Sequence, residues 1–188
     1  MADDGPEFTL DVSNLRGVIT AAKGYSPALA RSLRKRLRGT GEAIITEQRA
    51  VLDGPLPGNA RKTGSKIRWV EPRDGRKGYL RKVNTYDDVA ANRTRSRGMR
   101  TKIKASLKTR VVAGTTRQGV NVRAESRIGG AMTHAWQARR FKHPVFGTDE
   151  WATQNGQPYF WGPAVAGRAK ARAEIEKALA DAVAEITS

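Results

Sequence analysis

Few residues in this sequence have the types and spacing that catalysis or metal binding requires. His134 and His143 each lack a neighbouring carboxylate and a partner four residues away, so neither is expected to act as a base or a metal ligand. The carboxylates at positions 87–88 and 149–150 are adjacent in the chain, which points them in different directions and argues against a general acid and base. No serine lies in the turn that exposes a catalytic nucleophile. We therefore expect no enzymatic activity, no metal site and no cofactor.

The glycine-containing residues 58–66 (GNARKTGSK) depart from a phosphate-binding loop. Five residues separate Gly58 from Gly64 where that loop has four, and no lysine follows Gly64 directly. The segment before them is the predicted end of a helix, whereas the loop follows a buried strand. Nucleotide binding is therefore not expected.

Positive charge is the dominant property of the chain. Its 188 residues hold 35 Lys and Arg against 18 Asp and Glu, a formal net charge of +17. Residues 61–110 contain 17 basic and 4 acidic residues, so this central part carries +13 of the total. Such a chain is expected to bind a polyanion or an acidic partner surface.

Basic side chains recur at nearly every second position between residues 93 and 110. Few aromatic residues interleave with them, so contacts to phosphates fit better than stacking on bases or reading of a sequence. A solvated loop that contacts an acidic protein partner is the alternative interpretation. We predict that the segment faces DNA or the wall of a DNA channel, through Arg93, Arg95, Arg97, Arg100, Lys102, Lys104, Lys108 and Arg110.

The pattern of apolar residues predicts an α+β fold in a single domain spanning residues 1–188. Alternation over residues 8–12 predicts a short strand, and residues 15–24 predict a short helix. Ser26 and Pro27 then begin a long helix to about residue 52, because a hydroxyl caps free N–H groups and proline fits the first turn. The apolar stripe of this helix is Leu29, Leu33, Leu37, Ile44 and Val51.

The long helix is expected to end at residues 53–58, which hold two prolines and two glycines and favour turns. The remaining elements follow this segment. We predict a strand at 66–70, a long basic loop insertion at 71–102 that could hold a short strand at 79–83, and antiparallel strands at 103–113 and 119–124. A C-terminal helix over 163–187 is expected to pack on the small sheet and on the long N-terminal helix. The predicted contact face is Ile175, Leu179, Val183 and Ile186.

Aromatic side chains gather in residues 129–162, which show no regular pattern. Trp151, Tyr159, Phe160 and Trp161 are too dense for a surface loop, so we predict packing or a subunit interface and not ligand recognition. The residues expected in this role are Phe141, His143, Pro144, Phe146, Trp151, Tyr159, Phe160 and Trp161.

Compartment signals are weak in this chain. It contains no cysteine, which fits a reducing compartment. No run of 18 apolar residues occurs, and the acidic first residues lack the apolar core of a secretory signal. The expectation is a soluble protein that makes no membrane contact.

Residues 139–165 (RRFKHPVFGTDEWATQNGQPYFWGPAV), followed by a charged helix, resemble the C-terminal signature of a phage neck and minor tail-component family, the lambda-type Z-like tail completion proteins. The N-terminal half is similar as well, with a long basic helix, a proline-containing turn and a Thr-Gly step into a strand. The resemblance covers roughly residues 26–70 and 103–187, whereas residues 71–102 are longer and more basic than the family pattern. The matching positions of the signature are His143, Pro144, Val145, Phe146, Gly147, Trp151, Gln154, Pro158, Tyr159 and Phe160.

This resemblance implies a structural protein of the head-tail connector, or neck, of a long-tailed virion, with a role in tail completion or head-tail joining. It implies a ring, expected to be a hexamer, through which double-stranded DNA passes. The implied partners are other copies, neighbouring neck proteins and the tail tube or terminator, and the implied location is the virion, with assembly in the host cytoplasm.

The charge sets a limit on this expectation. Six copies would carry about +100, whereas a ring about 50 Å thick encloses roughly 30 phosphate charges at one per 1.7 Å. Most of the positive charge must therefore face acidic neighbours or solvent. The alternative function is a free basic protein that binds DNA without sequence preference, which would bind tightly as a monomer or dimer with a steep dependence on salt.

Overall fold

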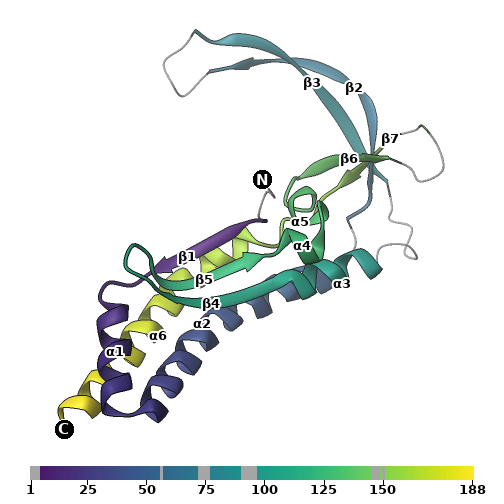
Figure 1. The fold of residues 1–188 in the computed structure, drawn as a ribbon. Helices are drawn as coiled ribbons and strands as arrows, with labels where there is room; N and C mark the ends of the chain where they lie inside the picture. The colour runs from purple at the N-terminus through teal and green to yellow at the C-terminus, as the bar shows by residue number, and fades with distance from the viewer. Residues whose placement is uncertain (1–4, 56, 72–76, 90–96, 145–148, 150) are drawn as a thin grey trace.

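A computed structural model describes residues 5–55, 57–71, 77–89, 97–144, 149 and 151–188. Its longest elements are two helices of 27 residues each, α2 (Pro27–Asp53) and α6 (Trp161–Thr187). They pack against each other and against α1 (Leu15–Tyr25), and a three-stranded sheet covers α2 (Figure 1). Helices and small antiparallel sheets thus combine as predicted, and the α+β fold class is confirmed.

Helix α2 begins and ends where its local sequence predicts. The Ser26 Oγ accepts a hydrogen bond from the Ala28 N–H at 3.2 Å, and Pro27 occupies the first turn. At the other end the Gly54 N–H donates to the carbonyls of Ala50 and Val51 before the chain turns away. The predicted stripe is buried from Leu29 to Ile44, and Val51 is half-buried.

Helix α6 packs on α2 through smaller side chains than predicted. Ile175 is fully buried and the half-buried Leu179 and Ile186 pack against the core, but Val183 is 43% exposed, so the predicted contact face is wrong at this position. A stripe of alanines carries the contact instead, since small side chains let two helices approach closely. The buried positions are Ala164, Ala171, Ile175, Ala178 and Ala182.

The three-stranded sheet has the order β1-β5-β4, with β1 (Glu7–Asp11), β5 (Gln118–Ala124) and β4 (Leu107–Ala113) all antiparallel. The register pairs Phe8 and Thr109 with Val122, and Leu10 and Val111 with Val120, so these side chains share one face. Leu10, Val120 and Val122 are buried in one core with the helices. The opposite face is polar and carries Glu7, Thr9, Asn121, Arg123, Lys108 and Arg110.

The chain before β4 is helical, which the sequence did not predict. Helix α3 (Arg97–Ser106) includes four residues of the strand predicted at 103–113 and the end of the loop predicted at 71–102. Ile103 is fully buried and Met99, one turn earlier, is packed on the core. These two residues give α3 an apolar face at helical spacing, and basic residues on both sides of it hide this pattern in the sequence. Two one-turn helices, α4 (Ser126–Gly129) and α5 (Met132–Ala135), follow β5.

A second sheet has the order β3-β2-β7-β6 and lies largely outside the body. Strands β2 (Asn59–Val70) and β3 (Tyr79–Val89) form a long antiparallel hairpin, which we call the arm. Strands β7 (Trp151–Asn155) and β6 (Arg140–Pro144) pair with each other, and β2 pairs with β7 at its first residue, Asn59. The arm is therefore held at its base and projects away from the helices (Figure 1).

The second sheet corrects several predictions. Strand β3 contains the short strand considered at 79–83 and continues to residue 89, where a loop was predicted, and β2 begins seven residues before the predicted strand at 66–70. The predicted irregular region 129–162 contains β6 and β7. Charged side chains lie on both faces of the arm because no further layer covers it, and such strands lack the alternation that identifies a half-buried strand. No helix in the described part of the chain is long and apolar enough to cross a membrane.

We expect opposite effects from alanine at two glycines of α2. A Cβ at Gly41 would overlap the Thr109 side chain of β4, whereas nothing lies within 4 Å of a Cβ at Gly39. Gly39→Ala should raise the free energy of unfolding by about 0.5–1 kcal/mol through helix propensity, and Gly41→Ala should lower it by about 1–3 kcal/mol through overpacking. Chemical denaturation of both variants measures this, and equal stabilisation of both would contradict the close approach of α2 to β4.

Candidate functional site

The structure describes six of the eight predicted DNA-facing residues, four in helix α3 and two in strand β4. Arg93 and Arg95 lie outside the described residues, and Arg97 is the first residue of α3. The segment from 97 to 110 is a helix followed by a strand and is no loop. Lys102, Lys108 and Arg110 are exposed.

Arg100 and Lys104 form contacts within the molecule. The Arg100 Nη1 donates to the carbonyls of Leu52 at 2.6 Å and Gly54 at 2.7 Å, and the Lys104 Nζ lies 2.5 Å from the Asp53 carboxylate. The last carbonyls of a helix have no partners inside the helix and carry partial negative charge, so a cation is favourable there. These two basic residues thus join α3 to the end of α2. Their charges are engaged within the molecule, whereas the sequence predicted that they face DNA.

Lys108 and Arg110 lie on the polar face of the three-stranded sheet. Their neighbours across β5 are Arg123 and Asn121. Arg123 is paired with Glu125 at 2.5 Å, and the buried Asn121 side chain donates to Glu7 and to the Thr9 hydroxyl. This face therefore mixes both signs of charge.

The arm carries a larger group of exposed basic residues. Arg68 and Arg81 lie directly opposite each other on one face, and like charges so placed repel. Near the base, the Arg140 guanidinium lies 4.9 Å from the centre of the Tyr86 ring, which holds β6 against the arm. The exposed basic residues of β2 and β3 are Arg61, Lys62, Lys66, Arg68, Arg81 and Lys82.

The other face of the arm carries three exposed apolar side chains near its far end, together with Lys82 opposite Ile67. The register places Trp69 opposite Leu80, and Ile67 is two residues from Trp69 on the same face. These side chains are 56%, 67% and 70% exposed, respectively. The indole of Trp69 lies over Gly78, where a Cβ would overlap the ring. Exposed apolar side chains grouped in this way mark interaction surfaces. Sequence reasoning missed this patch because it assigned no strand pairing to residues 77–82.

The aromatic stretch is divided between core and surface. Tyr159 and Phe160 are fully buried together with Trp136, the Tyr159 O–H donates to the Thr133 carbonyl at 3.1 Å, and the Phe160 carbonyl accepts from the Gln48 side chain at 3.1 Å. Burial raises the pKa of Tyr159 to about 12.

The prediction of packing within the chain is wrong for two members of this dense group, and their predicted role in a subunit interface stays a prediction. Trp151 is 65% exposed, because it lies at the end of the β6–β7 pair, opposite Pro144, where no other element among the described residues covers it. Trp161 lies on the open side of α6 and keeps an edge contact with the Phe160 ring, at 5.2 Å between centres. Pro144 is exposed, Phe141 and His143 are half-buried, and Phe146 lies outside the described residues.

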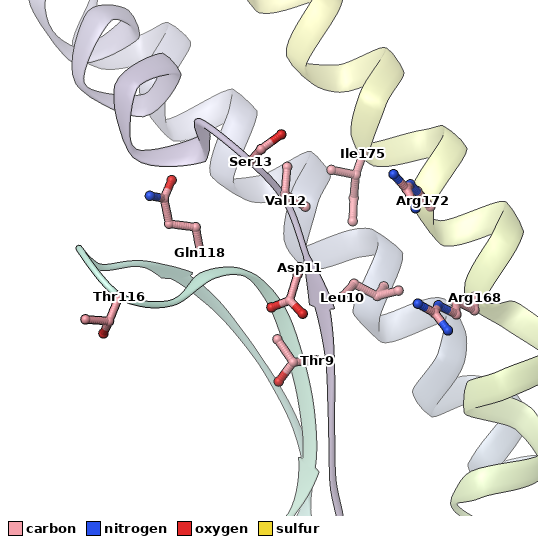
Figure 2. A pocket seen from close by; sticks show the side chains of 10 residues that line it. All are labelled: Thr9, Leu10, Asp11, Val12, Ser13, Thr116, Gln118, Arg168, Arg172 and Ile175. Carbon is pink, nitrogen blue, oxygen red and sulfur yellow. The ribbon is translucent and has the colours of Figure 1, made fainter.

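A polar pocket of about 540 Å³ lies beside β1. Figure 2 shows Arg168 and Arg172 projecting from α6 next to Leu10, while Thr9 and Asp11 point to the other side of the strand. The Arg172 Nε is paired with Glu176 at 2.9 Å. Two guanidinium groups favour an anion, and the carboxylate in the lining, Asp11, lies on the other side of the strand from them (Figure 2).

Metal binding finds no support in the part of the chain that the structure describes. No three His, Asp or Glu side chains there come together to hold an ion. The candidate sites that stand out in the described structure are surfaces, namely the two faces of the arm and the exposed aromatic residues.

Comparisons with known proteins add no family. No family model, no curated protein and no solved structure matches the chain.

Two substitutions in α3 should separate structural charge from surface charge. Arg100→Gln removes the cation from the end of α2 and should lower the free energy of unfolding by about 1–3 kcal/mol. Lys102→Gln removes the same charge from an exposed position and should change stability by less than about 0.5 kcal/mol. Urea denaturation provides the comparison. Equal losses in the two variants would show that total charge, and not the helix end, is the cause.

Tyr159 should make stability depend on pH in the alkaline range. Because its pKa is about 12 in the folded protein and 10.0 without burial, its contribution is complete below pH 10 and is lost as the pH rises towards 12. The unfolding free energy of the wild type, relative to that of Tyr159→Phe, should fall by about 2–3 kcal/mol over this range. Denaturation of both proteins at a series of pH values measures the difference, which also cancels titration of other groups. A constant difference would contradict burial of the hydroxyl.

Proposed function

We propose that the chain is a structural protein of the head-tail connector of a long-tailed phage, acting in tail completion or head-tail joining as a ring through which DNA passes. The resemblance of residues 139–165 to the tail completion proteins suggests the role. The observation that carries the proposal is the arm, a long hairpin held at its base and bearing an exposed apolar patch at its far end.

The arm fits a subunit that assembles with others. A two-stranded hairpin alone is marginally stable in water, and exposed apolar side chains on unprotected strands favour association. At about 3.4 Å per residue, the 12 residues of β2 reach roughly 40 Å, enough to contact a neighbouring subunit. An element of this kind costs stability in a monomer and is useful in an assembly.

The basic residues fit a DNA channel lined by phosphate contacts. DNA that slides needs contacts that are numerous, individually weak and interchangeable, and Lys and Arg side chains on exposed strands provide these. Lys108, Arg110 and the basic residues of the arm are candidates for this lining. Most of the charge of a ring would still face acidic neighbours.

The experiment is to determine the assembly state of the purified full-length chain. Light scattering coupled to size-exclusion chromatography should give a closed oligomer, expected to be a hexamer, and electron microscopy of negatively stained particles should show rings with a central channel. A chain that stays monomeric or dimeric at all concentrations would overturn the proposal.

The second candidate function is that of a free DNA-binding protein, and the exposed Arg68 and Arg81 favour it. A DNA-binding measurement distinguishes it from the connector. A connector should bind duplex DNA feebly until it forms a ring. A free binder should bind tightly as a monomer, with an affinity that falls steeply with salt and is equal for all sequences. Titration of labelled DNA at several salt concentrations measures this.

A further inference from the structure

A groove of about 670 Å³ runs between α2 and α6. On α2, Ala43 and Glu47 line the groove. They lie about 200° around the helix from Gly41 and Ile45, which face the sheet and the core. The groove therefore opens away from the sheet. The two helices approach closely at Gly167, where a Cβ would lie 3.2 Å from Ile44. The small side chains of alanines line the space beside this contact. The volume is within the range of about 300–1,000 Å³ that is common for binding sites.

The groove has an apolar floor and acidic residues at its edges. Ile44 and Val51 contribute to the floor, with the methyl groups of alanines around them. Glu47 and Glu174 are exposed at the rim, together with one basic residue, Lys170. The chain has a net charge of +17, so a groove with two carboxylates at its rim differs from most of its surface. These carboxylates favour a partner with basic side chains.

The far end of the arm has the complementary composition. Ile67, Trp69 and Leu80 form its apolar patch. On the same face the register places the exposed Lys82 opposite Ile67, whereas the exposed Lys66, Arg68 and Arg81 lie on the other face. Tryptophan surrounded by polar residues is typical of the side chains that dominate binding energy at interfaces.

We infer that the apolar patch of the arm, formed by Ile67, Trp69 and Leu80, binds in the α2–α6 groove of a second copy of this chain. Lys82, which lies opposite Ile67 on the same face, then meets Glu47 and Glu174 of that copy. The pocket beside β1 is a poorer acceptor, because Arg168 and Arg172 would repel the arm. The inference rests on the proposed function, since it names the contact that would close the ring.

The geometry makes this contact heterologous. Arm and groove are different surfaces, so each copy offers one arm and receives one, and repetition of the contact gives a ring when the rotation closes. Pairing with the groove of the same chain is disfavoured, because the arm projects away from α2 and α6 (Figure 1).

The test uses the natural absence of cysteine. One full-length variant carries Leu80→Cys on the arm, and a second carries Ala166→Cys in the groove. The two proteins are mixed and oxidised. The expected product is a covalent dimer of one chain of each kind. As a matched control, Ala21→Cys, exposed on α1, should give no such product with Leu80→Cys.

Two other products would overturn the inference. A dimer of two Leu80→Cys chains as the main product would mean that arms pair with each other. In a chain carrying both Leu80→Cys and Ala166→Cys, a cross-linked monomer would mean that the arm occupies its own groove, whereas covalent oligomers are expected.

Assembly of blocked variants gives an independent readout. Trp69→Ala on the arm and Ala43→Arg in the groove should each weaken self-association by about tenfold or more. Both positions are exposed, so the melting temperatures should match the wild type. A mixture of the two should form a one-to-one dimer, because one intact arm and one intact groove remain. If either variant does not fold, the other and the cross-link still decide.

The outcomes also separate this inference from the proposed function. Rings that persist in both blocked variants, without the arm-to-groove cross-link, would overturn the inference and leave the connector proposal standing. A wild-type chain that neither forms rings nor gives the cross-link would overturn both.

Discussion

Close packing around α2 is the constraint on which the rest of the molecule depends. Gly41 lets Thr109 of β4 approach one side of the helix, and Gly167 of α6 lies close to Ile44 on another. The buried Gln48 donates to the carbonyl of Phe160 and so joins the middle of α2 to the start of α6. Since protein interiors are packed to crystal density, side chains of another size at these positions would move both the sheet and α6.

The end of α2 connects this packed body to the arm. The carbonyls of the last turn are satisfied by Arg100 of α3 and by the side chain of Gln157, which donates to Val51. Lys104 adds an ion pair with Asp53. The arm begins at Asn59, a few residues later, and is paired there with β7. Charge that appears in the sequence as a surface property thus partly serves to hold the point from which the arm projects.

The arm itself lies outside any core, which explains its composition. A sheet needs a second layer to bury one face, and the arm has neither a helix nor another sheet against it in the described structure. Its apolar side chains are consequently exposed, and its basic residues occur on both strands. These exposed apolar side chains are the ones that the proposed assembly would cover.

Local signals in the sequence determined α1, α2, β1, β5 and the overall position of α6, because caps, prolines and apolar periodicity act over a few residues. The order of the residues also determined where the positive charge lies along the chain. Only the tertiary structure decided that Arg100 caps a helix, that Trp151 is exposed and that residues 79–89 pair with β2. Each of these depends on residues distant in the sequence, and a strand with no buried face lacks the hydrophobic pattern that would reveal it.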